Sequence, residues 1–267
     1  MFYSDYHVHT HFSGDSKTLP EDTIKKAIDL GVKKLCITDH YDADYPTEDI
    51  IFTFDISDYF HTLESLQDKY KKDIHILIGI ELGLQPHLKD YYDKIINNHP
   101  FDFIIGSSHL VDGIDPYLRA YYKNKSEHTA YGRYLESIIE NIDAFSGFQV
   151  YGHLDYIVRY GPYDNKLISH SNYTDIIDAL LLKLIHNHKG IEINTSGIRY
   201  GLGNPHPNVE IIKRYKELGG EIITIGSDAH IPDHLCSKFN EVYDILKSHG
   251  YKYYTVFEKQ KPEFIKL

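Results

Sequence analysis

Side chains that can bind a divalent metal ion recur directly after short apolar runs of the chain. Two pairs, His7 with His9 and Asp228 with His230, are spaced two residues apart. On a β-strand, residues two apart point to the same side, so each pair can contact a single ion. The complete set of candidate metal ligands is His7, His9, Asp15, His40, Glu81, His109, His153, Asp228 and His230.

The types of these side chains indicate which metals they would hold. Imidazole and carboxylate ligands suit zinc, manganese or iron. Nine ligands are more than one ion can use, and a carboxylate such as Glu81 can bridge two ions. We therefore expect two or three divalent ions with open positions for water and substrate. The charge of the site favours three ions, because the carboxylates of Asp15, Glu81 and Asp228 are all negative. Two divalent ions would leave little positive surplus, whereas three would leave a clear surplus for a phosphate dianion.

Seven short apolar runs alternate with helical patterns, and this alternation predicts how the ligands meet. The runs, which we interpret as strands, are 3–8, 34–38, 74–80, 101–105, 149–152, 190–193 and 221–225. The predicted helices are 20–30, 55–72, 87–98, 126–145, 172–189, 207–218 and 238–249. Such alternation indicates parallel strands joined by crossover helices. In a parallel barrel, reactive groups gather at the carboxyl ends of the strands, which is where the candidate ligands follow.

Seven strand–helix units, rather than eight, predict an α/β fold of the TIM-barrel type that is smaller or distorted, a (β/α)7 barrel. An open doubly wound sheet is the alternative, although no glycine-rich phosphate loop follows the first run. No linker, repeat or low-complexity segment interrupts the pattern, so we expect residues 1–267 to form a single domain.

The composition limits the classes of partner. The formal net charge is −11, whereas a general nucleic-acid binder usually has a basic field. The first residues lack the charged head and apolar stretch of a signal peptide, and no apolar run approaches the roughly 20 residues of a membrane span. The two cysteines are too few and too far apart for a disulfide framework. We expect a cytoplasmic protein without a nucleic-acid or membrane partner.

Two arginines follow predicted strands at the same end as the candidate ligands. Arginine suits bidentate contact with phosphate. Arg159 follows the fifth run and Arg199 follows the sixth, and we interpret both as catalytic residues that bind the phosphate, with an ordinary surface position as the alternative. The longest irregular stretch, 107–125, contains Tyr117, a candidate contact for the rest of the substrate. A solvated loop is the alternative for that stretch.

At these positions the sequence resembles the polymerase and histidinol phosphatase (PHP) family. The resemblance covers nearly the whole chain, with the motifs in family order. They are His7-Val8-His9-Thr10, Thr38-Asp39-His40, Glu81, His109, Gly152-His153-Leu154-Asp155 and Ser227-Asp228-Ala229-His230. Two further stretches, 108–113 and 192–197, look like the histidinol-phosphate phosphatase branch of that family.

The resemblance implies a distorted seven-stranded barrel that holds three divalent ions. One ion would take His7, His9, Glu81 and Asp228. A second would share Glu81 and add His109 and His153, and a third would take Asp15, His40 and His230. Among these ligands Asp15, Glu81, Asp228 and His230 are the candidates for a direct catalytic role.

The implied reaction is the hydrolysis of L-histidinol phosphate to L-histidinol and phosphate in histidine biosynthesis, by a hydroxide that bridges two metal ions. The leaving alkoxide needs a proton, and Asp39, Asp155 and water are all open as its donor. The main alternative is a PHP phosphoesterase that acts on a nucleotide or a phosphotyrosine protein. An amidohydrolase, which also places His-x-His after its first strand, and a metal-binding protein without activity are more distant alternatives.

Overall fold

The computed structural model describes residues 4–47 and 49–267. Its main sheet has the strand order β1-β2-β4-β5-β6-β7-β8, with the short β3 paired to β4. The strands are β1 (Ser4–Asp5), β2 (Lys34–Ile37), β3 (His40–Tyr41), β4 (His75–Gly83), β5 (Phe103–Ser107), β6 (Val150–Tyr151), β7 (Gly190–Asn194) and β8 (Ile223–Gly226). Neighbouring strands along this path pair in parallel. The predicted order of seven parallel strands is confirmed, although Tyr3, the start of the first predicted strand, lies outside the described residues.

The sheet closes into a nearly complete barrel because the segment after β1 bonds to the end of β8. The amide of Tyr6 donates to the carbonyl of Ile225 at 3.1 Å, and the amide of His9 donates to that of Ala229 at 2.9 Å. Val8 and Ala229 form a parallel bridge between these two segments. Residues that are more than 200 positions apart in the sequence therefore leave the barrel side by side.

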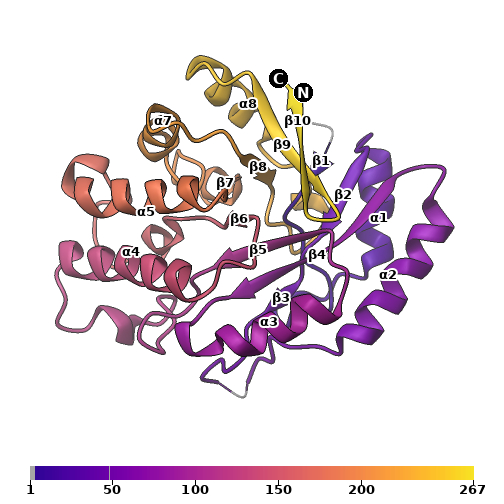
Figure 1. The fold of residues 1–267 in the computed structure, drawn as a ribbon, viewed down its shortest axis with the longest axis horizontal. Helices are drawn as coiled ribbons and strands as arrows, with labels where there is room; N and C mark the ends of the chain where they lie inside the picture. Colours follow the sequence, from indigo (N-terminus) through magenta and orange to yellow (C-terminus); the bar gives the residue numbers. More distant parts are fainter. Residues whose placement is uncertain (1–3, 48) are drawn as a thin grey trace.

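Helices surround the strands on the outside of the barrel (Figure 1). They are α1 (Pro20–Asp29), α2 (Ile56–Tyr70), α3 (Lys89–Asn98), α4 (Glu127–Ala144), α5 (Thr174–His186), α7 (Val209–Glu217) and α8 (Phe239–Ser248). The short α6 (Ser196–Arg199) instead follows the carboxyl-terminal end of β7. Local sequence sets several of their starts: Pro20 is the first residue of α1, and the Asp55 side chain accepts the amide of Asp58 at the start of α2. Among the described helices, none combines the length and the apolar character that a membrane span requires.

The sequence analysis did not predict the antiparallel hairpin of β9 (Tyr253–Glu258) and β10 (Lys261–Lys266). Its turn residues, Lys259 and Gln260, both have positive φ, and neither is a typical turn residue. The amides of both turn residues donate to Asp102, which precedes β5. The hairpin therefore lies at the amino-terminal end of the barrel, away from the strand ends that carry the candidate ligands.

Tyr6 joins this hairpin to the barrel. Its hydroxyl donates to the carbonyl of Phe257 at 2.7 Å and accepts the amide of the same residue at 3.1 Å. Phe257 lies opposite Pro262, which has no amide hydrogen to offer. Tyr6 is almost fully buried, so water does not take over either bond if the hydroxyl is lost.

We expect Tyr6→Phe to lower the free energy of unfolding by about 1–3 kcal/mol, because it leaves a buried amide and a buried carbonyl unpaired. Urea denaturation followed by circular dichroism measures this loss. Tyr253→Phe is the matched control, since it removes the same hydroxyl from a half-exposed tyrosine of the same hairpin. Equal stability of the two variants would show that the hydroxyl of Tyr6 does not hold the hairpin.

Candidate metal centre

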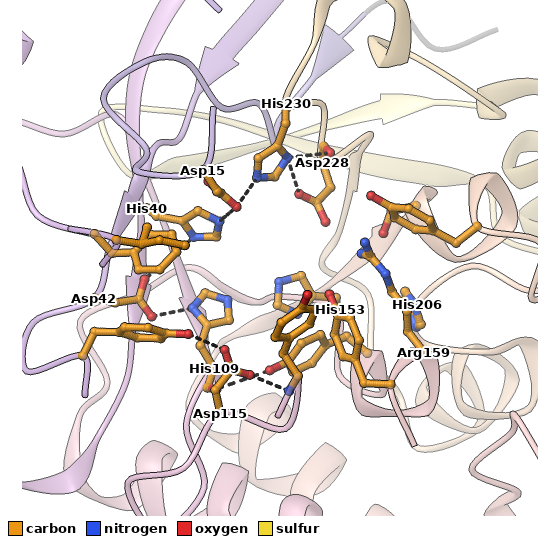
Figure 2. Close-up of a pocket in the computed structure, with 18 residues that line it drawn as sticks. Asp15, His40, Asp42, His109, Asp115, His153, Arg159, His206, Asp228 and His230 are labelled. Carbon is orange, nitrogen blue, oxygen red and sulfur yellow. Dashed lines mark hydrogen bonds and ion pairs between the residues drawn. The ribbon is translucent and has the colours of Figure 1, made fainter. Parts of the chain in front are cut away.

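All nine candidate ligands lie together at the carboxyl-terminal end of the barrel. His7, His9 and Asp15 lie in the segment after β1, His40 begins β3, and Glu81 lies near the end of β4. The remaining ligands, His109, His153, Asp228 and His230, lie in the loops after β5, β6 and β8. Four groups of three side chains offer ligand atoms within 4.8 Å of one another: His7, His9 and Glu81; Glu81, His109 and His153; His9, His40 and His230; and His40, Asp42 and His109. Asp15 adjoins these groups at 3.1 Å from His230 (Figure 2). Asp228 adjoins them at 3.3 Å from His9.

Glu81 is the centre of this cluster and is fully buried. Its Oε2 lies 3.1 Å from Nε2 of His7 and 2.8 Å from Nδ1 of His40. Its Oε1 lies 2.9 Å from Nε2 of His153 and 3.3 Å from Nε2 of His109. One carboxylate thus contacts imidazoles from several strand ends, which is the arrangement that a bridging ligand requires.

Burial and neighbouring charges shift the pKa values of the cluster, and for several groups they act in opposite directions. Burial alone would raise the pKa of Glu81, but the imidazoles of His7, His40 and His109 hold it well below its usual range. Burial alone would lower the pKa of His40, but Glu81 and Asp15 raise it to about 9. Burial, with the positive charges of His40 and His230, lowers the pKa of His9 well below its usual range. Without metal, the site therefore keeps Glu81 anionic and His9 neutral, the forms that bind metals, whereas His40 is held as imidazolium and must lose its proton when a metal binds.

Several buried ligand atoms of the cluster form no hydrogen bond of proper geometry, although each lies close to an oppositely charged atom. They are Nε2 of His7, Nε2 of His9, Nδ1 of His40, Oε2 of Glu81 and Nε2 of His230. A buried polar atom without a partner costs about 1–3 kcal/mol, so native proteins rarely leave several together. Divalent ions among these atoms would satisfy all of them, and the residues present therefore fit a metal centre.

Two carboxylates that the sequence analysis did not select hold the histidines in place. Oε1 of Glu192 lies 2.5 Å from Nδ1 of His7, and its other oxygen accepts the amide of His153 at 3.0 Å. Asp42 lies 2.6 Å from Nδ1 of His109. Such a carboxylate fixes the ring of a histidine ligand and its tautomer. The sequence contains one sign of this role, because Glu192 is a charged residue within the otherwise apolar strand β7.

Glycines make room for these two carboxylates. A methyl group at Gly83 would overlap the carboxylate of Asp42, and one at Gly226 would overlap that of Glu192. Both glycines lie on strands of the barrel, where their backbone conformation is extended and does not itself require glycine. The absence of a side chain, rather than backbone freedom, is what these positions contribute.

A cavity of about 360 Å³ opens above the cluster. Asp15, His40, His109, His153, Asp228 and His230 line one part of it. The rest of the wall includes Asp115, His206, Arg159 and a group of tyrosines, Tyr45, Tyr117, Tyr156, Tyr160 and Tyr200. The cavity is thus metal-ligating on one side and aromatic on the other, and its size suits a small molecule.

Two of the predicted substrate residues, Arg159 and Tyr117, line this cavity, whereas Arg199 lies outside its wall. The Arg159 guanidinium stacks on the ring of Tyr200, with its central carbon 3.2 Å from the ring centre. Tyr117 is about two-thirds exposed at the rim. Arg199 instead donates to the carbonyls of Ser227 and Asp228, at 2.5 and 3.0 Å, and so supports the turn that carries Asp228.

Neither carboxylate that was considered as a proton donor lines the cavity. Asp39 is buried and accepts hydrogen bonds from the amides and hydroxyls of Thr10 and Ser13. Asp155 is buried against His206 and Asn208. Both carboxylates stabilise loops around the site.

Comparisons with known proteins agree with this geometry. The PHP domain model matches residues 5–196. The chain is 32% identical over 263 residues to the histidinol-phosphatase of Lactococcus lactis, covering 96% of this chain and 95% of the relative. It is 34% identical over 249 residues to a probable histidinol-phosphatase of Clostridium acetobutylicum, covering 91% and 92%.

A solved structure extends the similarity to the whole fold. It is the histidinol phosphate phosphatase of Lactococcus lactis complexed with zinc, L-histidinol and phosphate, which superposes with a TM-score of 0.89. The superposition covers 98% of each chain at 31% identity. With a family model that spans more than half of its residues and relatives above 30% identity over nearly its full length, the chain belongs to the PHP family.

Proposed function

We propose that this protein is a metal-dependent histidinol-phosphate phosphatase, which hydrolyses L-histidinol phosphate to L-histidinol and phosphate. The observation that carries the proposal is the full-length likeness to the Lactococcus lactis enzyme, whose structure contains zinc, L-histidinol and phosphate. The metal-ligating cluster beneath a cavity of about 360 Å³ supports it, because the cavity is large enough for such a substrate. A place in cytoplasmic histidine biosynthesis is part of the same proposal.

We infer that the centre holds three divalent ions, of zinc, manganese or iron. The first would take His7, His9, Glu81 and Asp228, the second Glu81, His109 and His153, and the third Asp15, His40 and His230. When bound, such ions lower the pKa of water and offset the charge of the phosphate. Two of the four close groups in the structure, His7 with His9 and Glu81, and Glu81 with His109 and His153, support the first two assignments.

The side chains of the cavity wall would position the substrate. Arg159 has a guanidinium at the cavity, where it can bind two phosphoryl oxygens. We retain Arg199 as a second phosphate contact, because its buried Nε has no partner. Elsewhere in the wall, Asp115, fixed by a hydrogen bond from Tyr45, and the exposed ring of Tyr117 suit a cationic or aromatic group.

Phosphate release from L-histidinol phosphate tests the proposal, measured beside p-nitrophenyl phosphate, a nucleotide monophosphate and a phosphotyrosine peptide. We expect turnover that selects histidinol phosphate, that disappears after chelation and that returns when Zn²⁺ or Mn²⁺ is added. If metal-dependent turnover is faster on the nucleotide or the peptide, the proposed substrate is wrong, but the assignment as a metal-dependent phosphatase remains. Undiminished turnover by metal-free protein would overturn both.

We expect Arg159→Ala to lower kcat/KM for histidinol phosphate roughly 10- to 100-fold. The variant loses hydrogen bonds to a charged phosphate, and such bonds contribute about 1.5–3 kcal/mol. Steady-state kinetics measure the change. Arg119→Ala is the control, because Arg119 is exposed and lies outside the cavity wall in the same stretch of chain as Tyr117. An Arg159 variant with kinetics like those of the control would remove Arg159 from phosphate binding.

We expect Glu192→Gln to weaken zinc binding roughly 10- to 100-fold, because the variant no longer holds the ring of His7 with an anionic acceptor. Competition with a chromogenic chelator measures the affinity, independently of catalysis. The exposed Glu221, at the opposite end of the barrel, gives the matched variant Glu221→Gln, which should bind zinc normally. Wild-type affinity in Glu192→Gln would mean that the carboxylate only fills space.

A further inference from the structure

His206 is a buried histidine of the cavity wall that does not belong to the proposed ligand set. Its residue is only 2% exposed, and its Nε2 is buried without a hydrogen-bond partner. The backbone is fixed by a bridge to Asn194, with N···O distances of 2.8 and 2.7 Å. Figure 2 shows it on the side of the cavity that carries Arg159. His206 thus lines the cavity and has one ring nitrogen, Nε2, without a hydrogen-bond partner among the described residues.

The other nitrogen of this ring is held by Asp155. Nδ1 of His206 lies 2.6 Å from Oδ1 of Asp155, in a pair that is almost fully buried on both sides. Oδ2 of Asp155 accepts the amide of Asn208 at 2.9 Å and its side-chain amide at 3.0 Å. Both carboxylate oxygens of Asp155 therefore have partners, and the carboxylate fixes the orientation of the imidazole. Nε2 is the ring nitrogen that is left without a hydrogen-bond partner among the described residues.

Hydrolysis of a phosphate ester in this cavity needs a proton donor for the leaving oxygen. An alkoxide is a poor leaving group, so its oxygen must be protonated as the bond to phosphorus breaks. Asp39 and Asp155 do not line the cavity. The nitrogens of His7, His40, His109 and His153 nearest the centre face Glu81 and are assigned to metals. His206 is a donor in the wall that none of these assignments uses.

We propose that His206 is the proton donor to the leaving-group oxygen and that Asp155 is its positioning residue. As a water oxygen forms its bond to phosphorus, the ester P–O bond breaks and its electron pair stays on the leaving oxygen. That oxygen takes the proton from Nε2 and departs as the alcohol. The proton released by the attacking water returns to the imidazole through solvent, so ester and water become alcohol and phosphate. This inference rests on the proposed phosphatase function.

The test compares two kinds of leaving group in His206→Gln. Histidinol phosphate and a second alkyl phosphate need a proton donor, whereas p-nitrophenolate leaves as a stable anion. We expect kcat/KM to fall about 100-fold or more on both alkyl esters, the usual scale of general acid catalysis, and less than about 5-fold on p-nitrophenyl phosphate. Equal losses on all esters, or no loss on any, would overturn the role of His206. A merely structural histidine would not separate the two kinds of ester.

His170→Gln is the matched control. His170 also pairs with an aspartate, Asp178, at 2.8 Å, but it lies outside the cavity wall and is partly exposed. We expect it to leave both kinds of ester unaffected. If it reproduced the contrast between the esters, the contrast would not report on the proposed donor.

A second measurement uses the unaltered protein and does not depend on the folding of a variant. With a working proton donor, kcat/KM over a series of alkyl and aryl phosphates should depend weakly on the pKa of the leaving alcohol, and a steep dependence would overturn the inference. The two proposals fail separately. If the enzyme is inactive on histidinol phosphate but His206→Gln still loses more activity on other alkyl esters than on p-nitrophenyl phosphate, only the substrate assignment is wrong. Selective histidinol phosphate turnover without the contrast removes only His206.

Discussion

The buried carboxylate of Glu81 is the interaction on which the rest of the site depends. A charge without solvent is expensive unless oppositely charged or hydrogen-bonding groups surround it. Here the hydroxyl of Ser107 and imidazoles from both sides of the barrel surround it. They arrive there only because β1 lies beside β8 and the sheet is nearly closed. An open sheet of the same order would leave His7 at the edge strand β1, four strands away from His153 after β6, and Glu81 without enough partners.

Fixing these imidazoles requires a second layer of carboxylates, and the barrel has to provide space for it. Glu192 and Asp42 each contact a histidine from the side away from Glu81. Each carboxylate occupies the space that a side chain at Gly226 or Gly83 would take. Acidic groups on both sides of the rings keep the histidines oriented, but they also add negative charge, which the metal-free protein can offset only by protonating imidazole.

The sequence was sufficient to predict the parts of the molecule that follow a local rule. The i, i+2 spacing of His7 and His9, together with a candidate ligand after six of the seven strands, predicted where nine side chains would converge. Glu192 and Asp42 were missed because their function depends on contacts between strands that lie far apart in the chain. The hairpin β9–β10 was missed because Lys259 and Gln260 carry no turn signal. The contact of Arg199 with the turn at Asp228 likewise depends on how two loops pack, which no local pattern encodes.

The charge of the cavity connects this architecture to its chemistry. Glu81, Asp15 and Asp228 concentrate negative charge at the base, in a chain whose net charge is −11, and Arg159 is the one arginine in the described wall. In the metal-free site protonated imidazoles such as His40 are held by these carboxylates, which leaves little positive charge to attract a phosphate dianion. If metals supply the missing positive charge, metal and phosphate each favour the binding of the other, because coupling between two ligands is reciprocal. The acidic base that makes the cavity a poor anion site by itself is then what ties substrate binding to the presence of metal.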